Sequence, residues 1–132
     1  MAASESFSYI FDTSAIIAYL TNEAGAARVH SLKPRAAIPF MVYSELYYLL
    51  WQRKGKAEAD TFYGLVKSWD LPLLMPNERI ILTAGRLKAA HRLGIADSYI
   101  ASFALLHKIP LVTKDSDYEA LVPELKLVKL TA

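Results

Sequence analysis

The chain contains 132 residues, with 15 Lys and Arg against 13 Asp and Glu and with no cysteine. This length is typical of one domain, which we expect to span residues 1–132, with a flexible tail at residues 1–6. An apolar content of 54% excludes a largely disordered chain, and the lack of cysteine excludes disulfides, thiol catalysis and Cys-ligated metals. The net charge of +2 is too small to indicate a nucleic-acid-binding protein by itself.

The longest stretches without Lys, Arg, Asp or Glu are residues 13–22 and 98–107, ten residues each. A membrane-spanning helix needs about 20 apolar residues, so the sequence predicts none. Residues 1–6 carry no basic segment, and Asp12 interrupts the apolar run that a signal peptide would need. We therefore expect a cytoplasmic protein without a membrane partner.

Apolar runs and helical patterns alternate along the chain, separated by Gly, Pro and small polar residues. The first apolar run ends at Asp12, Thr13 and Ser14, which favour the start of a helix. A later helix runs to Leu93, where Gly94 is expected to end it. In chain order the sequence predicts a strand at 7–11, helices at 15–20 and 23–31, a strand at 36–40, helices at 41–53 and 57–69, a strand at 71–75, helices at 78–93 and 97–107, a strand at 109–113, a short helix at 116–122 and a strand at 126–130.

Strands that are separated by helices favour right-handed crossovers and a mostly parallel sheet between layers of helices. The first connection between strands spans about 25 residues and the next two about 30–35, long enough for pairs of helices. The predicted fold class is α/β, a three-layer sandwich with a central sheet of about four to five strands.

Acidic residues follow the predicted strands at one edge of this sheet. Asp12 comes directly after the first strand, and Asp115 and Asp117 come directly after the fourth. Glu45 lies early in the helix after the second strand, and Asp97 begins the helix after residues 94–96. Ligands of open parallel sheets bind at the carboxyl ends of the strands, so we expect these acids to lie near one another.

Two of these acids fall on helix faces that are otherwise apolar. Glu45 shares its face with Val42 and Leu46, and Asp97 shares its face with Ile100. Neither acid has Lys or Arg three or four residues further on, so no local base neutralises it. A buried carboxylate costs several kcal/mol unless it is paired or binds a metal. A cluster of this kind indicates a site for Mg²⁺ or Mn²⁺, which serves hydrolysis of phosphodiester bonds.

Four segments carry a resemblance to a known family. They are residues 9–15 (YIFDTSA), 44–46 (SEL), 93–101 (LGIADSYIA) and 111–118 (LVTKDSDY). In this order and spacing they resemble the PIN-domain family, and most of all the toxin ribonucleases of VapBC toxin–antitoxin pairs. The resemblance covers residues 8–130, nearly the whole chain.

The resemblance implies a metal-dependent endoribonuclease that uses one or two Mg²⁺ or Mn²⁺ ions. Asp12, Glu45 and Asp97 match the three core acids, which are metal ligands and catalytic residues. Asp115 matches the fourth acid, and Asp117 matches a second acid in the same turn, so the choice between them stays open. The implied partners are an RNA substrate, a cognate antitoxin and a second copy of the chain.

Each acid also has a purely structural interpretation. Asp12 and Asp97 could cap the helices that follow them, although Thr13 and Ser14 offer better caps than Asp12. Residues 116–119 have the spacing of a capping box that does not need Asp115, which favours Asp115 as the ligand. Glu45 has no comparable structural role.

Other residues have two possible roles. Tyr43, Tyr47 and Trp51 follow one another at helical spacing, and they either pack in the core or contact a second chain. Basic residues at 33, 35, 53–56, 86, 88 and 92 are either solvated or contact phosphates.

Two other classes of function remain open. A silent PIN-like module would bind RNA or protein without catalysis. A phosphotransfer protein would use Asp12 as phosphoacceptor, but a phosphatase of the haloacid dehalogenase type needs an Asp where this chain has Ser14.

Overall fold

Five short strands form one parallel sheet at the centre of the protein. The computed structural model describes residues 7–130, so the expected tail at residues 1–6 lies outside the described residues. The sheet has the order β3-β2-β1-β4-β5, and each pair of neighbours is parallel. The strands are β1 (Tyr9–Phe11), β2 (Ala36–Pro39), β3 (Leu73–Leu74), β4 (Leu111–Thr113) and β5 (Leu127–Lys129).

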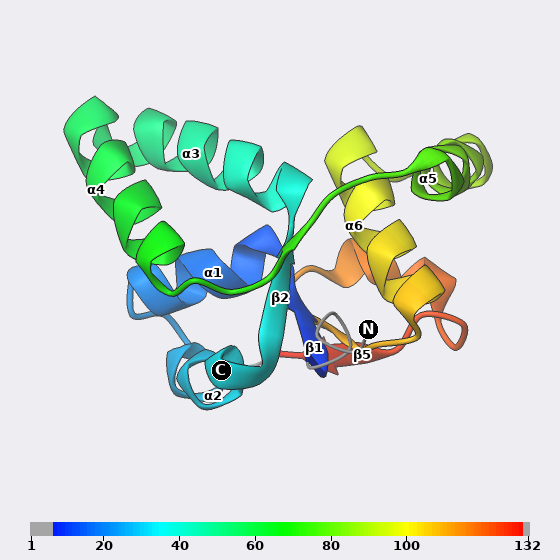
Figure 1. Cartoon of the computed structure of the whole chain (residues 1–132), viewed down its shortest axis with the longest axis horizontal. Helices are drawn as coiled ribbons and strands as arrows, with labels where there is room; N and C mark the ends of the chain where they lie inside the picture. The colour runs from blue at the N-terminus through cyan, green and yellow to red at the C-terminus, as the bar shows by residue number, and fades with distance from the viewer. Residues whose placement is uncertain (1–6, 131–132) are drawn as a thin grey trace.

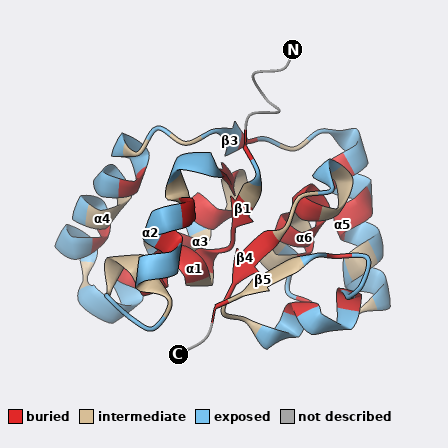
Figure 2. Ribbon diagram, turned by 90° about the horizontal axis from the view of Figure 1, so that it is seen from below, coloured by how far each residue is buried: buried red, intermediate tan, exposed pale blue. Residues whose placement is uncertain are grey.

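Helices flank this sheet on both sides, which confirms the predicted α/β sandwich. Helices α1 to α4 gather on one side of the sheet and α5 with α6 on the other (Figures 1 and 2). Within the described residues no helix is long and apolar enough to cross a membrane. The helices are α1 (Thr13–Leu20), α2 (Ala26–Leu32), α3 (Phe40–Lys54), α4 (Lys56–Ser68), α5 (Glu78–Ala90) and α6 (Ile95–His107), with 3-10 helices η2 (Lys33–Arg35) and η3 (Ser116–Leu121).

The chain changes direction across the sheet between β1 and β4. It moves from β1 outward to β2 and β3, and then returns past β1 to form β4 and β5 on the other side. Ile10 therefore pairs with Ala37 of β2 on one side and with Leu111 of β4 on the other. The carboxyl ends of the strands beside such a reversal form the crevice in which α/β sheets bind ligands.

The core fills the space between the sheet and the inner faces of the helices. Figure 2 shows the buried residues along β1, β4 and the sheet-facing sides of α1, α3 and α6. Ile10, Ile38 and Leu111 of the strands are fully buried, as are Leu46 of α3 and Ile100 of α6. Glu45 and Asp97 are each close in sequence to one of these core residues, so packing sets the position of both backbones.

The aromatic residues of α3 divide between the core and the surface. The rings of Tyr43 and Tyr47 each lie 5.7 Å from the ring of Tyr63 in α4, an edge-to-face packing within the chain. Tyr43 is buried, whereas Trp51 at the end of α3 is 46% exposed. Tyr43 therefore packs in the core, whereas Tyr47 is only partly buried and Trp51 packs on Tyr47 at the surface.

The boundary between α5 and α6 differs from the prediction. Helix α5 ends at Ala90 rather than Leu93, and Gly94 precedes α6 as its N-cap residue instead of ending α5. Gly94 has a φ of −66°, an ordinary extended conformation, so its freedom at positive φ is not used. Because α6 starts at Ile95, Asp97 lies inside its first turn, and the prediction that Asp97 caps this helix is wrong.

Candidate metal centre

Asp12 lies at the end of β1, directly before α1, and is only 3% exposed. Asp12 occupies the N-cap position of α1, but its side chain makes no cap hydrogen bond, so capping does not account for the carboxylate. Instead, its Oδ2 accepts hydrogen bonds from Thr113 Oγ1 at 2.7 Å and from Ser14 Oγ at 2.8 Å. The hydroxyl of Tyr118 lies 3.1 Å from its Oδ1. Three hydroxyl groups thus orient a buried carboxylate toward the crevice.

Glu45 reaches the same place from the second turn of α3. Its carboxylate is half-buried, and its Oε1 accepts a hydrogen bond of 2.5 Å from Thr13 Oγ1. Thr13 is the first residue of α1, so this bond ties the start of α1 to α3. The small polar residue beside Asp12 therefore positions a second acid that is 32 residues away in sequence.

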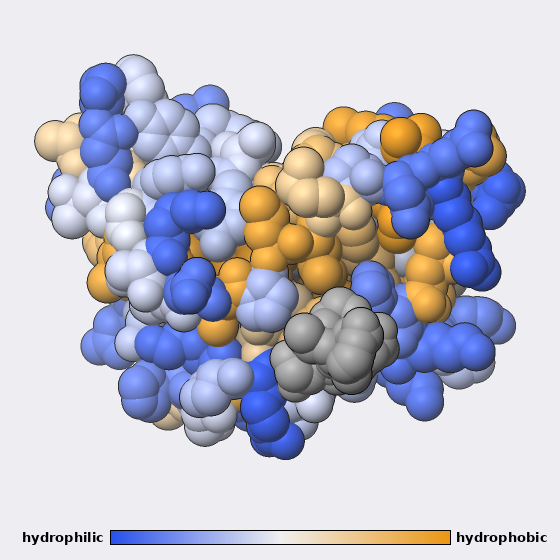
Figure 3. All heavy atoms as spheres, in the orientation of Figure 1, coloured by the Kyte–Doolittle hydropathy of each residue, from blue (hydrophilic) through white to orange (hydrophobic). Residues whose placement is uncertain are grey.

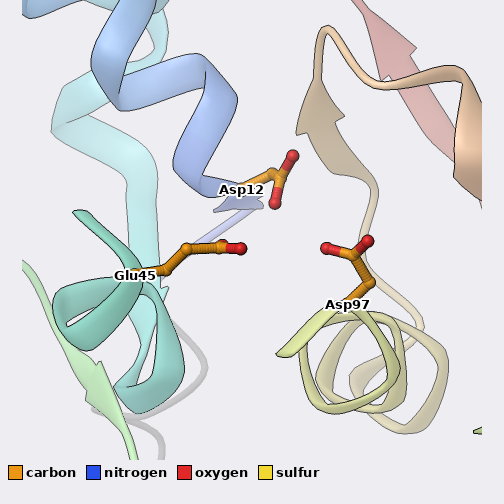
Figure 4. A group of neighbouring side chains, drawn as sticks. All are labelled: Asp12, Glu45 and Asp97. Atoms are coloured by element: carbon orange, nitrogen blue, oxygen red, sulfur yellow. The ribbon is translucent and has the colours of Figure 1, made fainter. Parts of the chain in front are cut away.

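Asp97 approaches from the opposite side, from the first turn of α6. Figure 4 shows the carboxylates of Asp12, Glu45 and Asp97 pointing toward one another from three separate elements. One oxygen from each of these acids lies within 4.8 Å of the others. This spacing allows a single cation to contact all three acids.

Asp115 and Asp117 form a second group of carboxylates with Asp97. One oxygen from each of these three acids also lies within 4.8 Å of the others, so Asp97 belongs to both groups. Asp115 lines the same cavity as Asp12, whereas Asp117 is exposed and does not line it. The side chain of Asp115 accepts a hydrogen bond of 2.8 Å from the backbone N–H of Asp117 and is the N-cap of η3. The prediction that this turn is capped without Asp115 is therefore wrong.

The acids line a cavity of about 260 Å³ at the carboxyl ends of the strands. Arg53 from α3 and Lys114 after β4 also line it, together with Glu23 from the α1–α2 connection. The Nζ atom of Lys114 lies 3.4 Å from Oε1 of Glu23. Within residues 7–130 no Lys or Arg forms an ion pair with the three converging acids. The more exposed part of the lining, which we call the rim, therefore carries the positive charges of Arg53 and Lys114 together with the negative charge of Glu23.

Burial changes the acidity of the three converging carboxyl groups. Loss of solvation raises the pKa of Asp97 from 3.8 to about 7, and the neighbouring charges of Asp12 and Glu45 add to this effect. Burial likewise raises the pKa of Asp12, against the opposing effect of its hydroxyl donors, and raises that of Glu45. These shifts are the mark of carboxylates that share a site without a cation.

The donor set fits a hard divalent cation. Carboxylate oxygens are the ligands that Mg²⁺ and Mn²⁺ prefer, and no soft sulfur or imidazole lies in the cavity lining. A cation would offset the loss of solvation that raises the pKa values of Asp12, Glu45 and Asp97, and would relieve the repulsion that adds to the shifts of Glu45 and Asp97. The residues present therefore suit a metal centre better than a purely structural cluster.

The stability of the metal-free protein is expected to fall as the pH rises from 5 to 7.5. Between its unfolded pKa of 3.8 and its folded pKa of about 7, Asp97 binds more protons in the folded state than in the unfolded state. Rising pH therefore favours unfolding over this interval. The raised pKa values of Asp12 and Glu45 act in the same direction.

Thermal unfolding in EDTA measures this effect, and we expect the midpoint to drop by several degrees. The carboxyl groups of Glu23 and Asp60 have lowered pKa values and are charged throughout this interval, so they do not offset the trend. A midpoint that climbs from pH 5 to 7.5 would contradict this account of the site.

The sequence and the structure were both compared with known proteins. The model of the PIN domain family matches residues 9–122, which is most of the chain and includes all of the acids described above. The chain belongs to the PIN domain family. No curated protein sequence matches this PIN domain closely enough to count as a relative.

Solved structures of toxin–antitoxin proteins share the fold of this PIN domain. VapBC2 from Rickettsia felis, bound to a DNA fragment from its promoter, has a TM-score of 0.75 at 21% identity, with 93% of this chain and 98% of that chain covered. VapBC-1 from nontypeable Haemophilus influenzae has a TM-score of 0.69 at 25% identity, with 92% and 96% covered. The sarcin–ricin loop cleaving toxin VapC20 of Mycobacterium tuberculosis has a TM-score of 0.74 at 18% identity, with 87% and 95% covered.

The structure brings together the five acids that the sequence predicts for the site and adds other residues to them. Asp12, Glu45 and Asp97 converge, and Asp115 and Asp117 adjoin them through Asp97. Residue type and spacing alone predict no role for Ser14 at Asp12, for Glu23 at the rim or for Tyr118. Ser14 lies in the YIFDTSA segment and Tyr118 in the LVTKDSDY segment, but their contacts could not be predicted, because hydroxyl contacts across elements leave no spacing in the sequence.

Proposed function

We propose that this PIN domain is a metal-dependent endoribonuclease and the toxin of a type II toxin–antitoxin pair. The observation that carries the proposal is the convergence of Asp12, Glu45 and Asp97 from three elements, with no basic partner within residues 7–130. The likeness to VapC toxin structures supports the same class of activity. A phosphoacceptor role for Asp12 is less consistent with a carboxylate that is 3% exposed and bound by three hydroxyl groups.

The proposed ligands are Asp12, Glu45, Asp97 and Asp115, with one or two Mg²⁺ or Mn²⁺ ions. An ion bound there would supply an activated water for attack on phosphorus and positive charge beside the leaving oxygen. We assign the fourth position to Asp115 rather than Asp117, because Asp115 lines the cavity and its charge acts on both Glu45 and Asp97. The protein's own contribution is to hold these oxygens in place before the substrate arrives.

Arg53 and Lys114 are the basic residues that we propose for contacts to RNA phosphates. Both line the cavity that holds the acids. Lys114 forms an ion pair with Glu23, whereas Arg53 is exposed and forms no ion pair within residues 7–130. Positive charge at the rim would hold the RNA backbone against the repulsion of the three converging carboxylates.

Replacing Arg53 by Gln is expected to weaken RNA binding several-fold at low salt. Each lost phosphate contact makes the dependence of log K on log salt concentration shallower by about 0.7 for single strands. Binding of a 2′-O-methyl RNA, which resists cleavage, measures this slope in EDTA. The matched control is Arg79→Gln, the same change at an exposed residue of α5, which should leave the slope unchanged. Equal slopes for Arg53→Gln and the unmodified protein would contradict the assignment.

We also propose a cognate antitoxin and a second copy of the chain as partners, acting where the RNA substrate is, in the cytoplasm. Structures of VapBC complexes with this fold support the first partner. Exposed apolar residues support a protein contact, and Figure 3 shows apolar residues gathered in the hollow between the α3–α4 side and the α5 side. Met75 is 62% exposed, and Ile81 and Leu82 of α5 are 48% and 55% exposed.

The purified protein is expected to cut RNA internally in the presence of Mn²⁺ or Mg²⁺ and to lose this activity in EDTA. The test uses ribosomal, transfer and messenger RNA, with fragment lengths read on denaturing gels. Cleavage that persists in EDTA would contradict the metal dependence. Intact RNA in all three samples would contradict the ribonuclease assignment and leave a silent binding module as the better account.

A further inference from the structure

Tyr118 places its hydroxyl group between two of the three converging acids. The hydroxyl oxygen lies 3.1 Å from Asp12 Oδ1 and 3.0 Å from Asp97 Oδ1. The side chain is fully buried in η3, directly after the turn that contains Asp115 and Asp117. A phenol has one proton to donate, so it hydrogen-bonds to one carboxylate at a time. Because its oxygen lies within hydrogen-bond distance of both, it can donate to either Asp12 or Asp97.

No other hydroxyl group in the described residues acts in this way. Ser14 and Thr113 donate to Asp12, and Thr13 donates to Glu45. Within residues 7–130, Tyr118 is the hydrogen-bond partner of Asp97 and the one side chain that hydrogen-bonds to two of the three acids. Asp12 and Asp97 come from elements more than 80 residues apart, so this contact couples β1 with α6 at the site.

Packing alone does not account for this hydroxyl group. The ring of Tyr118 is part of the apolar core, where Phe would fill nearly the same volume. A buried phenol loses its hydrogen bonds to water, which destabilises the folded protein unless the hydroxyl group finds another hydrogen-bond partner. Here both partners are carboxylates of the candidate metal centre, which gives the hydroxyl a role at that site.

We propose that Tyr118 is a positioning residue that holds Asp12 and Asp97 at the separation a divalent cation needs. This inference rests on the proposed metal-dependent function. Two carboxylates without a cation repel, and a shared donor keeps both side chains in the crevice. Without the hydroxyl, Asp97 can rotate away, and cation binding must then bring it back. Loss of a group that orients metal ligands typically lowers metal affinity by about 10–100-fold.

The test is Tyr118→Phe, which removes the hydroxyl and keeps the ring. Free Mn²⁺, read from its EPR signal during titration, gives the dissociation constant, which we expect to rise at least tenfold. The Mn²⁺ concentration for half-maximal RNA cleavage should rise by a similar factor, so that added Mn²⁺ recovers activity. The matched control is Tyr43→Phe, a buried tyrosine whose ring packs on Tyr63 outside the cavity, and its dissociation constant should not change.

An unchanged Mn²⁺ dissociation constant in Tyr118→Phe would overturn the proposal. A second measurement does not depend on the stability of that variant. It uses 3-fluorotyrosine, which retains the hydroxyl group, placed at position 118 or at position 43. Addition of Mg²⁺ should shift the ¹⁹F resonance at 118 and leave that at 43 in place, and a resonance at 118 that does not move would also overturn it. Failure of the unmodified protein to bind Mn²⁺ would instead overturn the proposed function itself.

Discussion

Replacing Asp12 by Asn is expected to lower RNA cleavage by roughly 1,000-fold, about 4 kcal/mol of transition-state stabilisation. Asp12 is the most buried of the candidate ligands, and three hydroxyl groups lie within hydrogen-bond distance of its carboxylate. Asn keeps one oxygen for these donors, so the fold should persist while the negative charge that attracts the cation is lost. Initial rates of RNA cleavage at saturating Mn²⁺ measure the effect.

The matched control for this variant is Asp70→Asn. Asp70 is exposed and has a φ of 53°, a left-handed conformation that Asn adopts readily. The control should cleave RNA within about twofold of the unmodified protein, since surface substitutions away from special features have small effects. Wild-type cleavage by a folded Asp12→Asn protein would reject the site.

Replacing Asp97 by Asn is expected to change stability and metal binding in opposite directions. The pKa of Asp97 is raised to about 7 by burial and by its acidic neighbours, so at pH 7.5 its charge destabilises the metal-free protein. Asn removes this charge and keeps an oxygen that can accept from Tyr118. In EDTA at pH 7.5 the unfolding midpoint of the variant should therefore exceed that of the unmodified protein by several degrees.

Addition of Mn²⁺ should reverse this order. A cation at 100 times its dissociation constant stabilises a folded protein by about 2.7 kcal/mol, because it binds the folded state alone. Asp97 belongs to both groups of carboxylates, so Asp97→Asn should lose nearly all of this stabilisation. Asp117→Asn, which alters the outer group alone, should keep most of it. Full stabilisation of Asp97→Asn by Mn²⁺ would contradict the assignment of Asp97 as a ligand.

The two stability experiments also separate metal binding from ordinary packing. A structural carboxylate would make the protein less stable when replaced, whatever the metal. A ligand held without its cation makes the protein more stable when replaced, and removes the response to the cation. Asp97 is the best residue for this distinction, because it belongs to both groups of carboxylates and its pKa is raised to about 7.

Much of the architecture was predictable because it follows from local chemistry. The alternation of apolar runs with helical patterns predicted the strands, a mostly parallel sheet and the edge at which the acids gather. Helix boundaries were less predictable. Gly is the residue type that most often ends a helix, yet Gly94 is the N-cap residue of α6. Asp115 shows the same limit, since the turn could be capped by Ser116 or by Asp115, and only the folded backbone selects Asp115.

The sequence by itself determined which acids could form the site, because strand ends and helix faces are encoded in short-range patterns of apolar and polar residues. The tertiary structure decided how those acids are held. The contacts of Thr13 with Glu45, of Thr113 with Asp12 and of Tyr118 with both Asp12 and Asp97 join residues that are 32, 101, 106 and 21 positions apart. Such hydrogen bonds require donor and acceptor to be aligned and placed to within a few tenths of an ångström. Tertiary packing sets this geometry, and the spacing of residues along the chain does not encode it.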